Sequence, residues 1–405
     1  MAAPLKTAAA SAGSFIPRAV FEVSPSITRS YFLGHHVGAL TSMRKILSNI
    51  GLVLECRDSR VPVTSTNPLL ETALAGRDRI IVYTKSDLCA PASANRWMEK
   101  QRQLLIDYHA TRSGITFEKE NGNNTDQDSS WNPINSDSGR RRARKGKKGA
   151  DDKTQVVFTD ERNPRSIQHL IDAIKTRAIA TDTLTGLRAL VVGMPNAGKS
   201  TLLNALRRVG LSLPKAARTG SQPGITRKLG TPVRVIAEDS ASGIEQGVFV
   251  VDTPGVFVPY VGDAAAMLKL SLVGCVKDGL VPLEVVADYL LFNLNLRDPG
   301  IYAELSPPTN DVLEFLDAVA VRTGKLQKGG VPRREQAADW IVQQWRKGNL
   351  GLFGLDDISE ENLKEKARRE RLGEEEHVSM NQAKKREKEA RKARHSAKRQ
   401  ATEGA

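Results

Sequence analysis

The chain of 405 residues is poor in cysteine and lacks long apolar runs. Its three cysteines, Cys56, Cys89 and Cys275, form no CxxC pair. This argues against a zinc site or a disulfide framework and fits a reducing compartment. No apolar run reaches the roughly 18 residues that a membrane-spanning helix needs, so we expect any membrane association to be peripheral. The length allows two or three domains, each with a sizeable core.

Basic residues are in clear excess, because 60 Lys and Arg stand against 46 Asp and Glu. The formal net charge of +14 favours a polyanionic partner or a membrane surface and says nothing about the fold.

The first thirty residues differ in composition from the rest. They are rich in Ala and Ser, carry Lys6, Arg18 and Arg29, and hold a single acid, Glu22. A secretory signal would need a compact apolar segment, which is missing. Residues 1–30 therefore predict a mitochondrial transit peptide, and an unstructured terminus is the alternative.

Six apolar segments alternate with helical patterns between residues 31 and 260. They lie at 49–60, 79–87, 154–160, 187–195, 232–239 and 247–255, with helical patterns at 94–108 and 167–179 among them. Continuous Val, Ile and Leu runs separated by helices predict an α/β fold with a doubly wound, mostly parallel sheet. Residues 119–153 are polar and nearly free of aliphatic side chains, so we expect a disordered basic insertion there.

The pattern changes after residue 260. Helical periodicity at 263–276, 282–296, 310–322 and 333–347 predicts a smaller all-helical domain over 261–356. Residues 357–405 form a charge-rich tail that is most basic at 381–399, typical of an exposed basic helix or a disordered arm.

The segment GMPNAGKST, residues 193–201, follows an apolar strand and precedes a helical pattern. It matches the phosphate-binding pattern GxxxxGK[ST], in which glycines let the backbone N–H groups face the phosphates. We expect Lys199 to reach the β and γ phosphates and Ser200 to bind Mg²⁺. The remaining contacts are assigned to Asn196, Ala197, Gly198 and Thr201.

Two segments further along complete such a site. In DTPG, residues 252–255, Asp252 is expected to hold Mg²⁺ through water, and the Gly255 N–H is expected to meet the γ-phosphate. In QPGIT, residues 222–226, Thr226 is expected to complete the metal shell. Lys199, Thr226 and Gly255 are thus candidate catalytic residues.

A loop typical of guanine recognition comes earlier in the chain. TKSD, residues 84–87, follows an apolar strand, and Asp87 is expected to accept both guanine N–H donors. Thr84, Lys85 and Ser86 would complete this loop, so GTP is expected rather than ATP. A doubly wound sheet brings such loops to one edge whichever is made first. The order predicts a GTPase domain whose halves are circularly permuted.

The order TKSD, VVFTD, GMPNAGKS, PGIT and DTPG resembles that of the circularly permuted ribosome-assembly GTPases of the YlqF type, especially their mitochondrial branch. YFLGHHVGAL (31–40), DSRVPVTSTNP (58–68) and GGVPRREQAADWIVQQWRKGNLG (329–351) are similar to further segments of that family. The resemblance implies binding of GTP, GDP and Mg²⁺ and a role on the mitochondrial large ribosomal subunit in support of mitochondrial translation. It also implies location in the matrix, with peripheral contact with the inner membrane compatible with the basic surface.

The chain departs from the family at several positions. Thr84 stands where the guanine loop usually begins with Asn, and His36 and Gly38 replace Met and Lys. The usual Ser-Ala after the third strand reads as Phe158 and Thr159, which we assign to base contact as a working hypothesis.

Hydrolysis is expected to be slow without help. Ras-type enzymes align the attacking water with a Gln directly after the DxxG glycine. In this chain that residue is Val256, whose side chain cannot form a hydrogen bond. The resemblance implies that Asn196 ligates K⁺, with a plain turn role as the alternative. His35 is a candidate to position the attacking water, and local packing or capping is the alternative.

Basic residues also mark the predicted helical domain. They are Lys277, Arg322, Lys325, Lys328, Arg333, Arg334, Arg346 and Lys347. Together with the basic insertion and tail, they predict contact with an RNA backbone, and no DNA partner is expected. Two other readings stay open: an RNA-binding scaffold that does not turn over nucleotide, and a related GTPase of the cytosol or nucleolus.

Overall fold

A computed structural model describes residues 15–24, 27–29, 31, 34–90, 94–112, 154–181, 185–217, 219–220, 229–258 and 260–371, together with Gln382 and Lys385. The predicted insertion, the first fourteen residues and nearly all of the tail beyond residue 371 lie outside the described residues.

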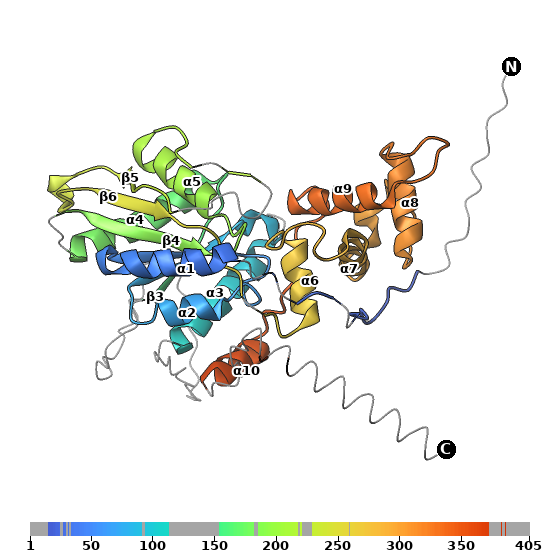
Figure 1. Cartoon of the computed structure of the whole chain (residues 1–405), viewed down its shortest axis with the longest axis horizontal. Helices are drawn as coiled ribbons and strands as arrows, with labels where there is room; N and C mark the ends of the chain where they lie inside the picture. The colour runs from blue at the N-terminus through green and yellow to red at the C-terminus, as the bar shows by residue number, and fades with distance from the viewer. Residues whose placement is uncertain are drawn as a thin grey trace, which may run out of the picture.

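Six strands form one sheet in the order β3-β2-β1-β4-β6-β5 (Figure 1). They are β1 (Leu52–Asp58), β2 (Arg79–Thr84), β3 (Thr154–Phe158), β4 (Leu187–Gly193), β5 (Val233–Ile236) and β6 (Val248–Asp252). All neighbours pair in parallel except β5, which runs antiparallel to β6. The predicted six strands and mostly parallel sheet are confirmed.

Helices cover both faces of the sheet. On one face lie α4 (Pro164–Thr181) and α5 (Lys199–Leu211), whose apolar residues share a core with Leu52, Leu54 and Cys56 of β1. On the other lie α1 (Gly34–Ile46), α2 (Pro68–Ala73) and α3 (Asn95–Arg112). There Val53 packs with residues of α1 and α2. Successive side chains of a strand point to opposite faces, so the continuous apolar run of β1 fills both cores.

Four helices follow the sheet and form what we call the helical region: α6 (Ala264–Leu272), α7 (Leu283–Asn295), α8 (Val312–Arg322) and α9 (Arg334–Arg346). Asp263 and Asp311 are the N-cap residues of α6 and α8, and their carboxylates accept hydrogen bonds from backbone N–H groups of the first turn. The core of this region is continuous with that of the α4/α5 face. Short 3-10 turns occur at Leu47–Asn49, Ser86–Leu88, Ser240–Ser242 and Pro299–Tyr302.

Two further segments pack onto these layers. The helix α10 (Glu360–Arg371) lies against α3, with Leu363 and Ala367 buried beside Leu105. The N-terminal segment, residues 15–24 and 27–29, lies along the helical region (Figure 1). There Arg18 forms an ion pair with Asp288 of α7. None of the described helices is long and apolar enough to cross a membrane.

Candidate nucleotide site

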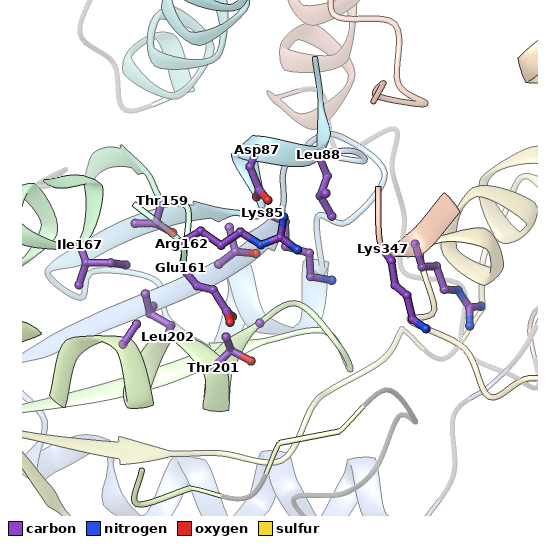
Figure 2. Close-up of a pocket in the computed structure, with 14 residues that line it drawn as sticks. Lys85, Asp87, Leu88, Thr159, Glu161, Arg162, Ile167, Thr201, Leu202 and Lys347 are labelled. Atoms are coloured by element: carbon purple, nitrogen blue, oxygen red, sulfur yellow. The ribbon is translucent and has the colours of Figure 1, made fainter. Parts of the chain in front are cut away.

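The sheet order brings the two nucleotide loops to one edge. Strand β1 lies between β2, which ends at Thr84, and β4, which ends at Gly193. The Thr84 hydroxyl donates a hydrogen bond of 2.9 Å to the carbonyl oxygen of Ala197 in the phosphate loop. A cavity of about 260 Å³ opens there, lined by Lys85 and Asp87 on one side and by Thr201 and Leu202 on the other (Figure 2). Gly198 of the phosphate loop also lines it.

The phosphate loop has the backbone that its glycines predict. Gly193 and Gly198 have φ angles of 144° and 84°, and a Cβ on Gly193 would lie 2.3 Å from the Cys56 carbonyl oxygen. Lys199 Nζ donates to the carbonyl oxygen of Met194 at 2.7 Å. Burial lowers the pKa of this ammonium, and the carboxylate of Asp252 acts against that shift. The loop therefore presents a desolvated cation at the start of α5.

Two of the residues assigned to Mg²⁺, Ser200 and Asp252, lie together. Ser200 Oγ donates to Asp252 Oδ2 at 2.6 Å. Asp252 Oδ1 is buried without a hydrogen-bond partner among the described residues, and burial raises the pKa of this carboxyl group. A buried carboxylate oxygen with no donor fits a hydrated divalent cation beside the Ser200 hydroxyl.

Gly255 packs directly on the phosphate loop. A Cβ at this position would lie 2.6 Å from the Cα of Pro195, so a larger residue would push the two loops apart. The next residue, Val256, donates its N–H to the Gly193 carbonyl oxygen at 3.1 Å. The DTPG segment therefore reaches the phosphate loop, as its position after β6 predicts.

The guanine loop is supported by a buried network of charges. Lys85 has a φ angle of 56°, and its Nζ donates to Asp58 Oδ2 and to the Asn196 carbonyl oxygen, both at 2.8 Å. Asp58 also pairs with Arg60 at 2.8 Å. Burial alone would raise the pKa of Asp58, but Arg60 and Lys85 hold it well below its ordinary range. The carboxylate of Asp58 thus stays charged and fixes the loop.

Of the residues assigned to the guanine loop and to base contact, Thr84, Lys85, Asp87 and Thr159 line the cavity. Burial raises the pKa of Asp87, and the charge of Asp160 adds to the shift. The Ser86 N–H donates to the Thr159 carbonyl oxygen at 3.2 Å. Phe158 instead stacks on Tyr83, with 5.1 Å between ring centres, in the core shared with α3 and α10. The structure therefore brings Thr159 to the cavity and turns the Phe158 ring away from it.

Two predicted residues cannot be placed. Thr226 falls in a stretch outside the described residues, and the His35 side chain is likewise not described, although its backbone belongs to α1.

The structure also shows contacts that the sequence did not reveal. His36 Nδ1 lies 2.9 Å from the Gly255 carbonyl oxygen, and Arg346 and Lys347 line the cavity. No local pattern indicated these contacts, because each depends on how distant segments pack.

The sheet and the two loops define the class of protein. This is a P-loop GTPase fold in which the guanine loop precedes the phosphate loop in the chain while both lie at the same sheet edge.

Comparison with known proteins agrees with this assignment to the GTPases. The sequence profile of the family described as "50S ribosome-binding GTPase" matches residues 188–319. Mitochondrial GTPase 1 of Schizosaccharomyces japonicus is 34% identical over 339 residues, which cover 83% of this chain and 93% of that protein. Mitochondrial ribosome-associated GTPase 1 of Xenopus tropicalis is 28% identical over 85% of this chain and 99% of its own length. Ribosome biogenesis GTPase A of Priestia megaterium is 27% identical over 82% and 98%, respectively. The chain belongs to the mitochondrial GTPase 1 family, which confirms the resemblance found in the sequence.

Proposed function

We propose that this protein binds and hydrolyses GTP in the mitochondrion and assists assembly of the large ribosomal subunit, so that its nucleotide state controls rRNA binding and thereby supports mitochondrial translation. The observation that carries the proposal is the hydrogen bond from Thr84 to Ala197, because it joins a guanine-type loop to a phosphate loop at one cavity. The names of the ribosome-associated and ribosome-biogenesis relatives support the ribosomal part.

In this proposal each end of the cavity holds one end of the nucleotide. The carboxylate of Asp87 accepts the guanine N–H donors, and Lys85 and Thr159 border the base. Lys199 leaves the Met194 carbonyl oxygen to meet the β and γ phosphates, and the Gly255 N–H meets the γ-phosphate. Ser200, Asp252 and Thr226 hold Mg²⁺, which neutralises phosphate charge when bound.

We infer slow intrinsic hydrolysis. Val256 is 2% exposed and packs in the core shared with α1 and α2, so its side chain is not available to align water. Asn196 is proposed to ligate K⁺ near the developing negative charge, and His35 is proposed to position the attacking water. Single-turnover hydrolysis by His35→Ala at the wild-type rate would remove His35 from this scheme.

The rRNA contact is assigned to the helical region. Lys328 and Arg333 are exposed in the loop between α8 and α9, whereas Arg334 and Arg346 are paired with Asp317 and Asp278. Unpaired exposed cations are suited to sequence-independent contact with phosphates. We place the protein in the matrix, with peripheral contact with the inner membrane through the same basic surface.

Nucleotide titrations test the binding proposal. The wild type should prefer GTP and GDP to ATP, and Asp87→Ala should lose roughly a hundredfold in GTP affinity, because a charged hydrogen-bonding partner of the base is removed. Asp339→Ala, which removes an exposed carboxylate from α9, is the matched control. Equal affinity of the wild type for GTP and ATP would contradict the proposal.

Phosphate release and sedimentation test the remaining parts. Release should rise when mitochondrial large subunits and KCl are present, and the GTP-analogue form should sediment with those subunits. No phosphate release under these conditions, with binding intact, would favour the scaffold that does not turn over nucleotide. Sedimentation only with cytosolic subunits would point to an assembly factor outside mitochondria.

A further inference from the structure

The helical region supplies one wall of the nucleotide cavity. Arg346 at the end of α9 and Lys347 directly after it line the same cavity as Lys85, Asp87 and Thr201 (Figure 2). These two residues follow the guanine loop by about 260 positions in the chain. The cavity is therefore completed by a part of the protein that lies outside the six-stranded sheet.

Arg346 is fixed in place by its own contacts. Its guanidinium donates to the carbonyl oxygens of Ser271 and Leu272 at 2.7 and 2.9 Å. It also pairs with Asp278 at 2.8 Å. These bonds join the end of α9 to the segment that ends α6, and they leave Arg346 committed to a structural role.

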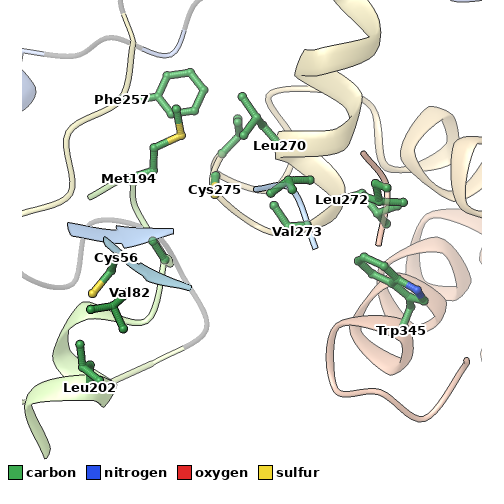
Figure 3. Packing of buried hydrophobic residues seen from close by; sticks show 14 of the residues in the cluster. Cys56, Val82, Met194, Leu202, Phe257, Leu270, Leu272, Val273, Cys275 and Trp345 are labelled. Carbon is green, nitrogen blue, oxygen red and sulfur yellow. The ribbon is translucent and has the colours of Figure 1, made fainter. Parts of the chain in front are cut away.

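The backbone at the end of α9 also touches the guanine loop. A Cβ on Gly348, whose φ angle is 83°, would lie 2.8 Å from Leu88 Cδ2. One turn earlier, Trp345 is buried near Leu272 (Figure 3). The Arg60 guanidinium lies over the Trp345 ring, 4.8 Å from the ring centre. Arg60 in turn pairs with Asp58, which holds Lys85. Contacts of Trp345 before it and of Gly348 after it thus fix the backbone of residue 347 relative to the guanine loop.

Lys347 itself is exposed, and its ammonium makes no hydrogen bond or ion pair with the residues that the structure describes. The other two lysines of the site are engaged, since Lys85 donates to Asp58 and Asn196, and Lys199 donates to Met194. An exposed cation that lines the candidate nucleotide cavity, and has no ion-pair partner among the described residues, is suited to binding an anion.

We propose that Lys347 is a nucleotide-binding residue, whose ammonium contacts the phosphate chain of the bound guanine nucleotide. This rests on the proposed GTP binding and extends it to the helical region. Because binding energies are reciprocal, a partner that shifts the end of α9 changes nucleotide affinity, and bound nucleotide restrains the end of α9 to the same extent. The lysine thereby links the ribosome-facing region to nucleotide release.

Release of a fluorescent GDP, mant-GDP, from the full chain tests the proposal in a stopped-flow instrument. Lys347→Gln should release mant-GDP about three- to tenfold faster than the wild type, the range expected between an exposed ion pair and a charge-assisted hydrogen bond. Lys347→Arg should stay near the wild-type rate. Lys100→Gln removes the same charge from the exposed surface of α3 and should leave release unchanged. Thermal unfolding of each variant checks that the fold is kept.

The outcomes separate this inference from the broader proposal. Release from Lys347→Gln at the wild-type rate overturns the role of Lys347 while GTP binding stands. The same result with weakened binding to large subunits would assign Lys347 to RNA instead. Failure of the wild type to bind mant-GDP overturns both proposals. Faster release from both Lys347→Gln and Lys100→Gln would show a general effect of charge and also overturns the specific contact.

Discussion

The side-chain amide of Asn196 donates a hydrogen bond of 2.8 Å to the Gly274 carbonyl oxygen, so the phosphate loop is tied directly to the turn after α6. Asn196 has a φ angle of 55°, and its own carbonyl oxygen accepts from Lys85. One residue of the phosphate loop therefore contacts the guanine loop and the helical region together. Any cation bound by Asn196 would lie at the junction of all three.

The first prediction concerns this junction. Asn196→Ala removes the amide proposed to ligate K⁺, so its rate of phosphate release in KCl should fall to its rate in NaCl, whereas the wild type should be faster in KCl. The control Asn349→Ala removes an exposed amide just after α9 and should keep the KCl advantage. An undiminished ratio of the two rates in Asn196→Ala would refute the K⁺ role.

A second prediction concerns Thr84, which replaces the usual Asn. Its hydroxyl makes the bond to the Ala197 carbonyl oxygen that joins the two loops. Thr84→Val keeps the shape but loses that bond, worth about 1 kcal/mol, so GTP affinity should fall about fivefold. Thr84→Ser keeps the hydroxyl and should bind like the wild type. Calorimetric titration with GTP measures both, and equal affinity of the valine variant would show that the bond is dispensable.

Acidification should weaken the fold through Asp58. Because its folded-state pKa is held well below the ordinary value, Asp58 contributes its full stabilisation above the unfolded-state pKa of about 3.9. That contribution is lost as the pH falls below this value towards the folded-state pKa. The free energy of unfolding, measured in urea, should therefore drop below about pH 4.

A matched pair of variants isolates this carboxylate. Asp58→Asn should be less stable at neutral pH, because Arg60 and Lys85 lose their partner, and should respond less to pH below about 4. Asp317→Asn, which breaks the exposed pair with Arg334, should change the profile much less, since water screens that pair. Parallel pH profiles for Asp58→Asn and the wild type would contradict the assignment.

The fourth prediction concerns the N-terminal segment, which was assigned to a transit peptide from its composition. Phe21 packs edge-on against Tyr289, at 5.2 Å between ring centres, and Ile27 is buried. The Arg18–Asp288 pair adds a third contact with the rest of the protein. Deleting residues 1–30 should therefore destabilise the protein by about 3 kcal/mol.

The same contacts bear on maturation. We expect the imported protein to retain residues 15–29, so mass spectrometry of its N-terminus should find a start at or before residue 15. A mature chain that begins after Arg29, with unchanged stability, would contradict this expectation.

The strands and the phosphate loop could be predicted because their signals are local. A run such as LRALVVG has few alternatives to a buried strand, and the GK[ST] pattern places the loop at its end. The helices α1 and α10 carry weaker signals. The first contains Gly34 and Gly38, and the second is mostly charged, with Leu363 and Ala367 as its buried apolar residues. In α1 tertiary packing overrides the weak helix propensity of the glycines. The residues of α10 favour a helix, but its few apolar side chains do not indicate where that helix packs.

The residues of the cavity could likewise be predicted only in part. Asp87 and Lys199 could be assigned from their motifs, whereas Lys347 looked like one of several surface cations. Its place at the cavity follows from the contact between Gly348 and Leu88, which joins segments far apart in the chain. The local sequence around neither residue indicates this contact. The sequence likewise points to His35 and not to its neighbour His36, because the contact of His36 with Gly255 forms only on folding.

The path of the backbone limits how far the helical region can travel. Arg29 and Val261 share a backbone hydrogen bond of 2.8 Å where the chain passes into the sheet and out of it. The chain then returns a third time, where the Leu355 N–H donates to the Arg60 carbonyl oxygen at 2.7 Å. A body attached by three backbone crossings cannot swing through a wide arc without breaking one of them. The proposed coupling between a ribosomal partner and the nucleotide should therefore act through small displacements at the end of α9, rather than through an opening of the whole molecule.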